Sequence, residues 1–542
     1  MGVPNTRRAQ RQSSMGAEIP ASILGINVVT SLSTMNPAEC IYSYNIGAED
    51  LGMTVREGNA ELANGWTGGI SRTVIPFEGN VAADDKLFVA NDAGIWDVTT
   101  ADTTAPTQVV TFPSTAGDAG ICSSVNFSND GDERFLLVCD MENGYYRWTQ
   151  STNTWVKYTQ GAGANQIDNV NPALFDYLMI WKERLWFVQE DSANAWYLPI
   201  GVYEGAAVKF NFGAQFKFGG ALRSIHNWTL DGGAGIDDFL VAISGAGDVI
   251  VYQGTDPADA ATFALVGSWY VGQLPTGNRI AFEYSGEVYI LSIQGLLPMS
   301  TVLNNANAKD PYTYLTAKIS PYVRNVMSTA LNDFGWQVYV NPKKSKLYIN
   351  SPPRTGYDQL GFSFYFGNQS WSMDRGIDKA HSANWKGDLY WTDISRNKLF
   401  KQTGGADNVY IDPTTDGQPI AVTWDILTAY QPLGNSPSTF KRAQFIRPMF
   451  SAQGVPAFTV AARYDYSIAE LSGAPSYAIG GAGVWDNGDW NTATWAYGTE
   501  KSDTPRGGAG MGRHVAVIMR GVSASPTTLA AFDLTYDEGG LL

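Results

Sequence analysis

A short pattern of hydrophobic and polar positions recurs along most of this chain. Each copy is a charged residue, then four or five apolar residues rich in aromatics, then a turn and a second strand-like run. Successive copies begin about 48, 50, 54, 49, 59 and 42 residues apart. The copies start at Lys86, Arg134, Arg184, Asp238, Glu287, Lys346 and Asp388. A degenerate β repeat near this length is typical of propeller blades.

The repeat predicts an all-β chain in which residues 66–410 form a β-propeller of six or seven blades. Three apolar runs that do not alternate should be central strands buried on both faces. They are Leu87–Val89, Leu185–Val188 and Val288–Leu291. The longest gap between copies contains the best helix candidate, which follows Pro321 and carries Val323, Val326, Met327 and Leu331 at helical spacing.

The sequence on either side of the repeats divides into three further parts. Residues 1–22 are polar and basic and are predicted to be a flexible N-terminal arm. Residues 23–65 contain short strands and turns without the repeat and are predicted to be a platform segment, not a blade. Residues 411–542 alternate apolar and polar positions between Gly/Ser/Pro-rich turns, which predicts a separate antiparallel β-domain. Because propeller termini usually lie close together, we expect residues 23–65 to pack with this domain.

An aromatic-rich stretch within the last domain places Trp485, Trp490 and Trp495 at intervals of five. That spacing fits neither face of a strand nor one face of a helix. The three side chains are therefore candidates for a subunit interface, on a loop or arm that packs on a neighbour. A local aromatic cluster within the domain's own core is the alternative, and the sequence leaves both open.

Charge and cysteine content narrow the function classes. The formal net charge is −16, whereas a protein that grips nucleic acid needs clustered Lys and Arg. An acidic surface is still compatible with DNA that slides past without binding. The three cysteines show no CxxC spacing, so neither a disulfide framework nor a zinc site is expected. The chain has no run of eighteen apolar residues, and no apolar region follows Arg7, Arg8 and Arg11, so neither a membrane span nor a secretory signal is predicted.

The sequence contains no recognisable enzymatic motif. His226, His381 and His514 lie apart from any nucleophile or ligand motif. The glycine-rich stretch 507–512 is interpreted as a loop, and residues 129–133 as a hairpin turn rather than a calcium loop. We expect no catalytic residue, metal or cofactor. The many Asp and Glu residues nevertheless leave open a carboxylate pair of the glycosidase kind.

Two segments outside the repeats carry further information. The first contains Gly25, Asn27, Met35, Pro37, Asn45, Arg56 and Gly58, and the second contains Asp416, Gly417 and Pro419. In this order the chain resembles the tail nozzle proteins of short-tailed bacteriophages, which include tail tubular protein B and the packaged-DNA stabilisation proteins. One departure is the turn after Asn45, where relatives often have an aromatic–Pro pair.

The resemblance implies a structural virion protein of the phage tail, made in the host cytoplasm. It implies a homohexameric ring below an adaptor ring, with tail fibre or spike proteins attached and duplex DNA passing through the lumen without sequence-specific binding. Such a ring would retain the genome and conduct it during ejection. The acidic charge agrees, because a lumen of that sign repels phosphates. The alternative function is a glycan-binding or glycan-hydrolysing tail propeller, for which the host cell surface is the partner.

Overall fold

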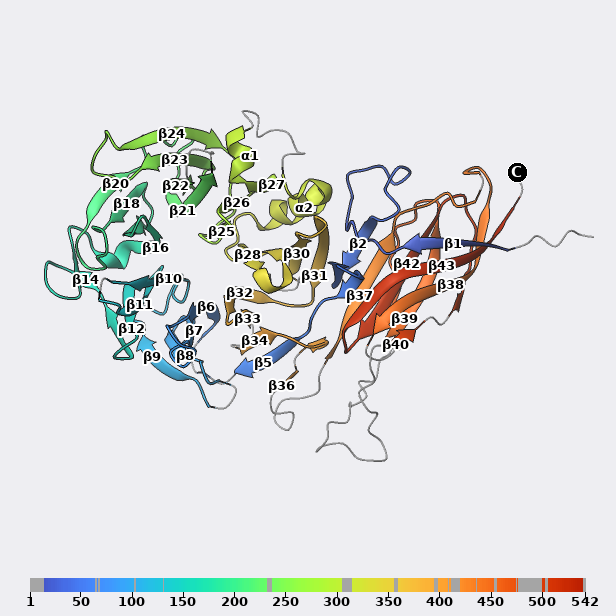
Figure 1. The fold of residues 1–542 in the computed structure, drawn as a ribbon, viewed down its shortest axis with the longest axis horizontal. Coiled ribbons are helices and arrows are strands. Elements are labelled where there is room, and N and C mark those ends of the chain that lie inside the picture. Colours follow the sequence, from blue (N-terminus) through green and yellow to red (C-terminus); the bar gives the residue numbers. More distant parts are fainter. Residues whose placement is uncertain are drawn as a thin grey trace, which may run out of the picture.

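The computed structural model describes most of the chain. The described residues are 14–63, 66, 69–101, 104–129, 131–231, 236–304, 314–354, 359–393, 398–407, 409–410, 420–434, 436–452, 456–473, 475, 500–502 and 505–539. The fold is nearly all β, with a β-propeller beside a separate antiparallel β-domain, the platform domain (Figure 1). This is the fold class that the repeat predicted.

The described residues form seven blades. The first three are β6 (Ser71–Phe77), β7 (Lys86–Asn91), β8 (Gly94–Asp97) and β9 (Thr107–Thr111); β10 (Cys122–Ser128), β11 (Arg134–Asp140), β12 (Gly144–Thr149) and β13 (Thr154–Lys157); and β16 (Phe175–Trp181), β17 (Arg184–Gln189), β18 (Asn194–Tyr197) and β20 (Val208–Asn211). The fourth and fifth are β21 (Leu222–Asp231), β22 (Ile236–Ser244), β23 (Asp248–Gly254) and β24 (Phe263–Tyr270); and β25 (Ala281–Tyr284), β26 (Glu287–Ser292) and β27 (Gly295–Pro298).

The last two blades join the propeller to the rest of the chain. They are β28 (Gln337–Asn341), β29 (Lys346–Asn350), β30 (Leu360–Tyr365) and β31 (Ser370–Arg375); and β32 (Lys379–Trp385), β33 (Asp388–Asp393), β34 (Lys398–Gln402), β5 (Asn59–Ala63) and β36 (Val409–Tyr410). A small sheet of β14 (Thr159–Gln160), β15 (Gln166–Asp168) and β19 (Gly205–Ala206) lies outside the blades. The innermost strands contact one another in the order β6, β10, β16, β21, β25, β28, β32 and back to β6, so the ring is closed.

The central strands are packed from both sides, as their apolar runs predicted. Leu87–Val89 in β7 and Leu185–Val188 in β17 are buried throughout. Within Val288–Leu291 of β26, Tyr289 alone is only half-buried. Each blade is covered by its two neighbours, so a central strand has no solvent-facing side.

The predicted helix is confirmed and lies where the fifth blade lacks a fourth strand. The chain passes from β27 into α1 (Met299–Asn304) and then α2 (Ser320–Ala330) before it enters β28. In α2, Val323 and Met327 are buried, and Val326 and Leu331 pack against the same core. Short 3-10 turns occupy Pro172–Leu174, Ala317–Ile319 and Pro342–Lys344.

The ring is closed by a strand from the N-terminal side of the propeller. Strand β5 pairs antiparallel with β34, with Asn59 opposite Gln402 and Ala63 beside Leu399. The assignment of residues 59–63 to the platform segment is therefore wrong, because they complete the seventh blade. Without β5, the outer edge of β34 would expose unpaired backbone groups.

The platform domain consists of two sheets. One contains β3 (Ile46–Glu49), β4 (Gly52–Val55), β43 (Thr527–Glu538), β38 (Lys441–Ala452) and β40 (Glu500–Ser502), with β1 (Met15–Pro20) paired to β43 and β41 (Arg506–Gly507) paired to β38. The other contains β2 (Cys40–Tyr44), β37 (Ile420–Thr428), β42 (Val515–Ser523) and β39 (Ala457–Tyr464), with β35 (Ala406–Asp407) beside β37. The second sheet continues into the sixth blade, because β2 also pairs with β31.

The N-terminal segment belongs largely to this domain. Strands β2 and β4 pair with β37 and β43, and the backbone N–H of Ala429 donates to the carbonyl oxygen of Glu39. The predicted flexible arm is wrong for Met15–Pro20, which form β1 with Ile19 fully buried opposite Phe532. Residues 1–13 lie outside the described residues.

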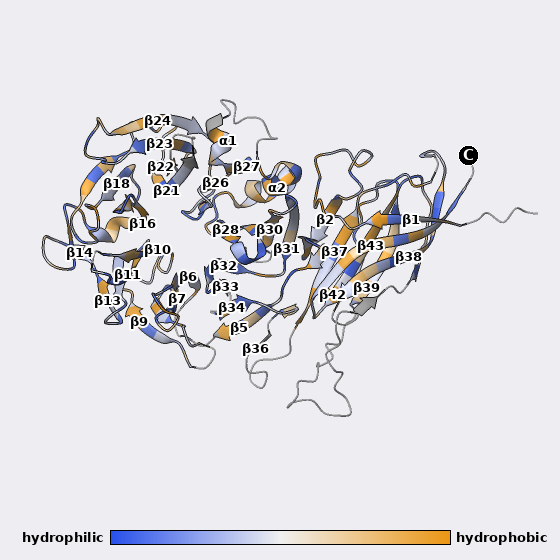
Figure 2. Ribbon diagram, viewed as in Figure 1, coloured by the Kyte–Doolittle hydropathy of each residue, from blue (hydrophilic) through white to orange (hydrophobic). Residues whose placement is uncertain are grey.

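Alternating burial along the platform strands explains how the two sheets pack. In β38, buried and exposed positions alternate, and both colours of the hydropathy scale recur along this strand (Figure 2). The Phe450 ring reaches across to the other sheet, where its centroid lies 6.0 Å from that of Trp424 and 5.4 Å from that of Phe458. These three aromatic side chains form the centre of the platform core.

We predict that Phe450→Ala lowers the free energy of unfolding by about 3–5 kcal/mol, because it removes a buried ring and leaves a cavity. Phe445→Ala on the same strand is the control. Its side chain is 54% exposed, and we expect a change within about 0.5 kcal/mol. Denaturant unfolding followed by tryptophan fluorescence measures both. Equal losses for the two variants would contradict this account of the core.

Candidate functional site

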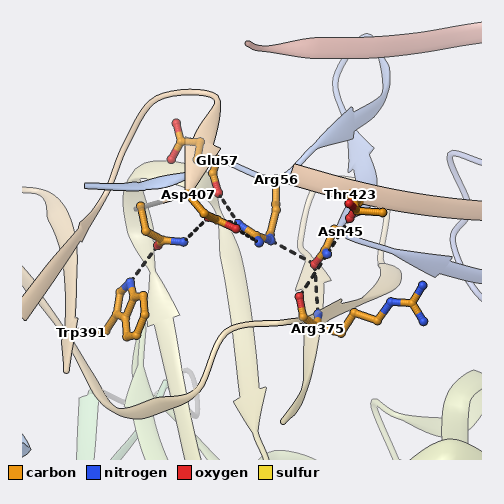
Figure 3. Close-up of polar contacts among 8 residues, drawn as sticks. Asn45, Arg56, Glu57, Arg375, Trp391, Asp407 and Thr423 are labelled. Atoms are coloured by element: carbon orange, nitrogen blue, oxygen red, sulfur yellow. Dashed lines mark hydrogen bonds and ion pairs between the residues drawn. The ribbon is translucent and has the colours of Figure 1, made fainter. Parts of the chain in front are cut away.

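Three sequence motif residues of the opening segment, Asn45, Arg56 and Gly58, lie where the propeller joins the platform domain. The chain leaves β4 through Arg56 and enters the seventh blade at β5. After β34 it passes through Asp407 in β35, pairs once more with β5 through β36, and enters β37. The two crossings lie side by side, and Figure 3 shows the polar side chains that connect them. We call this cluster of Asn45, Arg56, Asn59, Arg375 and Asp407 the junction.

A two-pronged ion pair joins the two crossings. Arg56 Nη1 lies 2.8 Å from Asp407 Oδ1, and Nη2 lies 2.5 Å from Oδ2. The side chains are only 10% and 17% exposed. Asn59 Nδ2 donates to Asp407 Oδ1 at 2.7 Å, and Trp391 Nε1 donates to Asn59 Oδ1 at 2.8 Å. Because the guanidinium and the carboxylate are both planar, their two hydrogen bonds fix the orientation of Arg56 relative to Asp407 as well as the distance between them.

Asn45 connects the same cluster to both the propeller and the platform domain. Its Oδ1 accepts from Arg56 Nε and from the backbone N–H of Arg375, each at 3.0 Å. Its Nδ2 donates to the carbonyl oxygen of Thr423 at 2.8 Å and to that of Arg375 at 3.1 Å. The backbone of Asn45 has φ 57°, a left-handed conformation that asparagine tolerates better than most residues. Asparagine is suited to this position because its amide both donates and accepts.

Two glycines of the motif lie where a side chain would collide with backbone. A Cβ on Gly58 would lie 1.8 Å from the carbonyl oxygen of Ala406, beside the junction. A Cβ on Gly25 would lie 2.5 Å from the carbonyl oxygen of Trp371, and Gly25 has φ 70°. Both glycines therefore allow the N-terminal segment to lie directly against its neighbours.

A second charged group extends the junction along β37. The buried carboxylate of Asp425 pairs with both Arg375 and Arg520. The hydrogen bond to Asp425 raises the pKa of Arg520, so this guanidinium stays charged at any physiological pH. The Arg375 guanidinium also lies 4.2 Å from the centre of the Tyr44 ring. Strands β2, β31, β37 and β42 are thereby connected by charge as well as by backbone pairing.

The remaining motif residues lie elsewhere. Asn27 holds a loop, because its Nδ2 donates to Glu39 Oε2 at 2.9 Å and its Oδ1 accepts from the N–H groups of Val29 and Thr30. Met35 is buried and Pro37 is exposed in a turn. Asp416, Gly417 and Pro419 lie outside the described residues. So do the interface candidates Trp485, Trp490 and Trp495.

The three histidines have partners of their own. His226 Nε2 lies 2.9 Å from Ser224 Oγ, and its Nδ1 lies 3.3 Å from Glu283 Oε1. His381 Nδ1 accepts from the N–H of Val74 at 3.1 Å, and burial with the charge of Arg279 lowers the pKa of His381 well below its usual value. The His514 ring lies 5.0 Å from that of Tyr466. Within the described part of the chain, no group of three or more His, Cys, Asp or Glu side chains could hold a metal ion.

The turn at 129–133, the glycine-rich stretch and the cysteines all have structural roles in the fold. Asn129 Oδ1 accepts from the N–H groups of Gly131 and Glu133 at 3.1 Å, which closes a turn. Gly508 donates its N–H to the carbonyl oxygen of Gln444, so the glycine-rich stretch lies along β38. All three cysteines are free and buried, and burial raises the pKa of each thiol. No helix among the described residues is long and apolar enough to cross a membrane.

The chain shows some likeness to known proteins among solved structures. No protein-family model matches the chain, and no curated protein matches it significantly. Among solved structures, the chain is similar to the β-propeller domain of Cps50 (Swd1) from Myceliophteria thermophila, at 14% identity and a TM-score of 0.34 over 63% of this chain and 99% of that one. It is also similar to a quinonprotein alcohol dehydrogenase-like protein from Bacteroides thetaiotaomicron, at 12% identity and a TM-score of 0.34 over 59% and 76%.

These likenesses concern the fold alone, and the blade assignment rests on the strand pairing of this chain itself. The chain is a β-propeller protein with an added platform domain. Asn45, Arg56 and Gly58 are part of the sequence motif, whereas Asp407, Asn59 and Arg375 are not. Asp407 lies 351 residues from Arg56, and no local pattern in the sequence connects the two.

We predict that Arg56→Gln lowers the free energy of unfolding by about 3–5 kcal/mol, because it leaves the Asp407 carboxylate partly buried without its counter-charge. The double variant with Asp407→Asn should recover part of this loss, with a coupling energy of about 1–3 kcal/mol. Lys343→Gln is the control, because its partner Asp388 also pairs with Lys401 and Lys343 is itself exposed. Additive losses in the double-mutant cycle would contradict a direct Arg56–Asp407 interaction.

Proposed function

We propose that this chain is a structural tail nozzle protein of a short-tailed bacteriophage. In this proposal it is a subunit of a ring that retains the packaged genome, conducts it during ejection and carries tail fibres. The observation that carries the proposal is the junction. Asn45 and Arg56, two residues through which the opening segment resembles that family, hold the propeller to the platform domain.

The mechanical demands on a conduit support this proposal. A ring under the pressure of packaged DNA must transmit load between its parts without opening. Here the propeller and the platform domain share one continuous sheet through β31 and β2. In addition, the junction ties together the two chain segments that pass between them. Flexible linkers would let the two bodies move independently, whereas this arrangement makes them one rigid unit.

Net charge supports a conduit as well. The chain carries a formal charge of −16, and a ring of such subunits would present the same sign as DNA. Repulsion keeps phosphates from binding to the wall, so the DNA slides. The axial channel of the propeller itself is not the proposed path. Arg279 crosses it with hydrogen bonds to Thr73 and to the carbonyl oxygens of Arg72 and Cys122, so the DNA would pass through the lumen between subunits.

Electron microscopy of the virion and of the purified protein tests the proposal. We expect a six-fold ring with a central channel wide enough for duplex DNA, six being the number implied by the family resemblance. Antibody labelling should place the chain in the tail, below the adaptor. A protein that stays monomeric within intact virions, or that binds or cleaves host polysaccharide as a free subunit, would contradict the nozzle function and favour the glycan-directed alternative.

We further predict that Trp485→Ala combined with Trp490→Ala weakens ring assembly more than it lowers the stability of the subunit. Ring interfaces are heterologous, so an aromatic segment of one subunit would bind a different surface of the next. Sedimentation velocity measures assembly and thermal unfolding measures stability. The matched control is Trp155→Ala, since Trp155 packs beside Phe88 within the propeller and should affect stability first. Normal assembly of the double variant would show that Trp485 and Trp490 do not contribute to the subunit interface.

A further inference from the structure

The propeller encloses an axial cavity of about 540 Å³, lined by the innermost strands of all seven blades. Its wall is mostly neutral. Among the lining residues, Arg279 is the one arginine and Glu283 is the one carboxylate, and no lysine or aspartate lines it. The two charged side chains lie four residues apart on the same extended segment, so about 13 Å of the channel separates their positions in the backbone.

Arg279 reaches across this cavity. It comes from the segment that leads into β25, and its guanidinium bonds to residues of β6 and β10 or next to them. In the ring of seven inner strands, β6 and β10 are each three places from β25, so they stand on the opposite wall. Nη1 donates to the carbonyl oxygen of Arg72 at 3.1 Å, and Nη2 donates to Thr73 Oγ1 at 2.5 Å.

The charge of Arg279 is not balanced at this end of the cavity. All of its hydrogen-bond acceptors are neutral, and it forms no ion pair with any described residue. The one carboxylate in the lining, Glu283, lies toward the other end of the cavity. Its Oε1 is 3.3 Å from His226 Nδ1. Burial and the nearby charge of Arg72 lower the pKa of Arg279 to about 10, which still leaves it charged at neutral pH. A partly buried cation without a counter-ion is costly.

A second donor lies beside Arg279. Because His381 Nδ1 accepts the N–H of Val74 and the ring is neutral, the tautomer assigned by that bond carries its proton on Nε2. His381 also lines the cavity, and no described residue accepts from its Nε2–H. Arg279 has five N–H groups and three protein acceptors, so it too keeps free donors. This end of the cavity therefore offers hydrogen-bond donors and positive charge together.

We propose that the Arg279 end of the propeller channel binds a small oxyanion of the phosphate or sulfate class. Such an ion has several acceptor oxygens in different directions, which suits neighbouring donors that come from two different blades. Its charge balances the guanidinium. The site would connect the fifth, first and second blades across the ring axis. A bound ion would therefore stabilise the closed ring. This inference concerns the subunit alone and stands independently of the nozzle proposal.

Isothermal titration of the full chain with inorganic phosphate tests the site, at constant ionic strength balanced with chloride. We expect saturable binding to the wild-type protein and at least tenfold weaker binding to Arg279→Gln. The control is Arg324→Gln, which removes the same charge from the exposed face of α2 and should bind phosphate like the wild type. Sulfate should compete with phosphate. Equal affinity of all three proteins, or no saturable heat for the wild type, would overturn the proposal.

Thermal unfolding supplies an independent readout. Phosphate stabilises most proteins in a general way, so the informative quantity is the difference between variants. The saturable part of the rise in unfolding temperature should be present in wild type and Arg324→Gln and absent in Arg279→Gln. If Arg279→Gln does not fold, phosphate binding is measured with Arg279→Lys instead. It retains the charge but loses the planar donor set, and we expect several-fold weaker binding. Unchanged affinity in that variant would also overturn the site.

Discussion

The ion pair between Arg56 and Asp407 is the constraint on which the rest of this structure depends. In this propeller the chain enters and leaves at the same blade, the seventh, and both crossings pass through one buried cluster. Strand β5 closes the seventh blade before the repeats begin, and β34 lies beside it after they end. Because the two crossings are held together, the contacts that close the ring lie beside those that attach the platform domain.

The position of the platform domain follows from this constraint. Asn45 holds the end of the sixth blade against β37, and Asp425 holds Arg375 and Arg520 on either side of the same strand. The sheet of the sixth blade consequently runs on into the platform domain instead of ending at an edge. An edge covered in this way is unavailable for pairing with another chain. Function then depends on what the fused unit assembles with, since a propeller by itself is a scaffold.

The parts of this fold that the sequence predicted are those with local periodicity. Apolar runs such as Leu185–Val188 identify blade strands because each is covered on both sides, and the spacing in Val323 and Met327 identifies α2. Strand β5 has the sequence NAELA, which lacks the β-branched and aromatic residues typical of strands, and its partners in β34 lie more than 300 residues away. Asp407 lies 351 residues from Arg56 and Arg279 lies 206 residues from Thr73, so only the folded chain brings these partners together.

Differential scanning calorimetry tests the central claim, that the junction makes the propeller and the platform domain one cooperative unit. The account predicts a single transition for the wild-type protein, with the calorimetric enthalpy equal to the van 't Hoff enthalpy. For Arg56→Gln it predicts a broader transition whose van 't Hoff enthalpy falls below the calorimetric enthalpy, because the two bodies then unfold less cooperatively. Two independent transitions already present in the wild type would contradict it, and so would one unchanged transition in the variant.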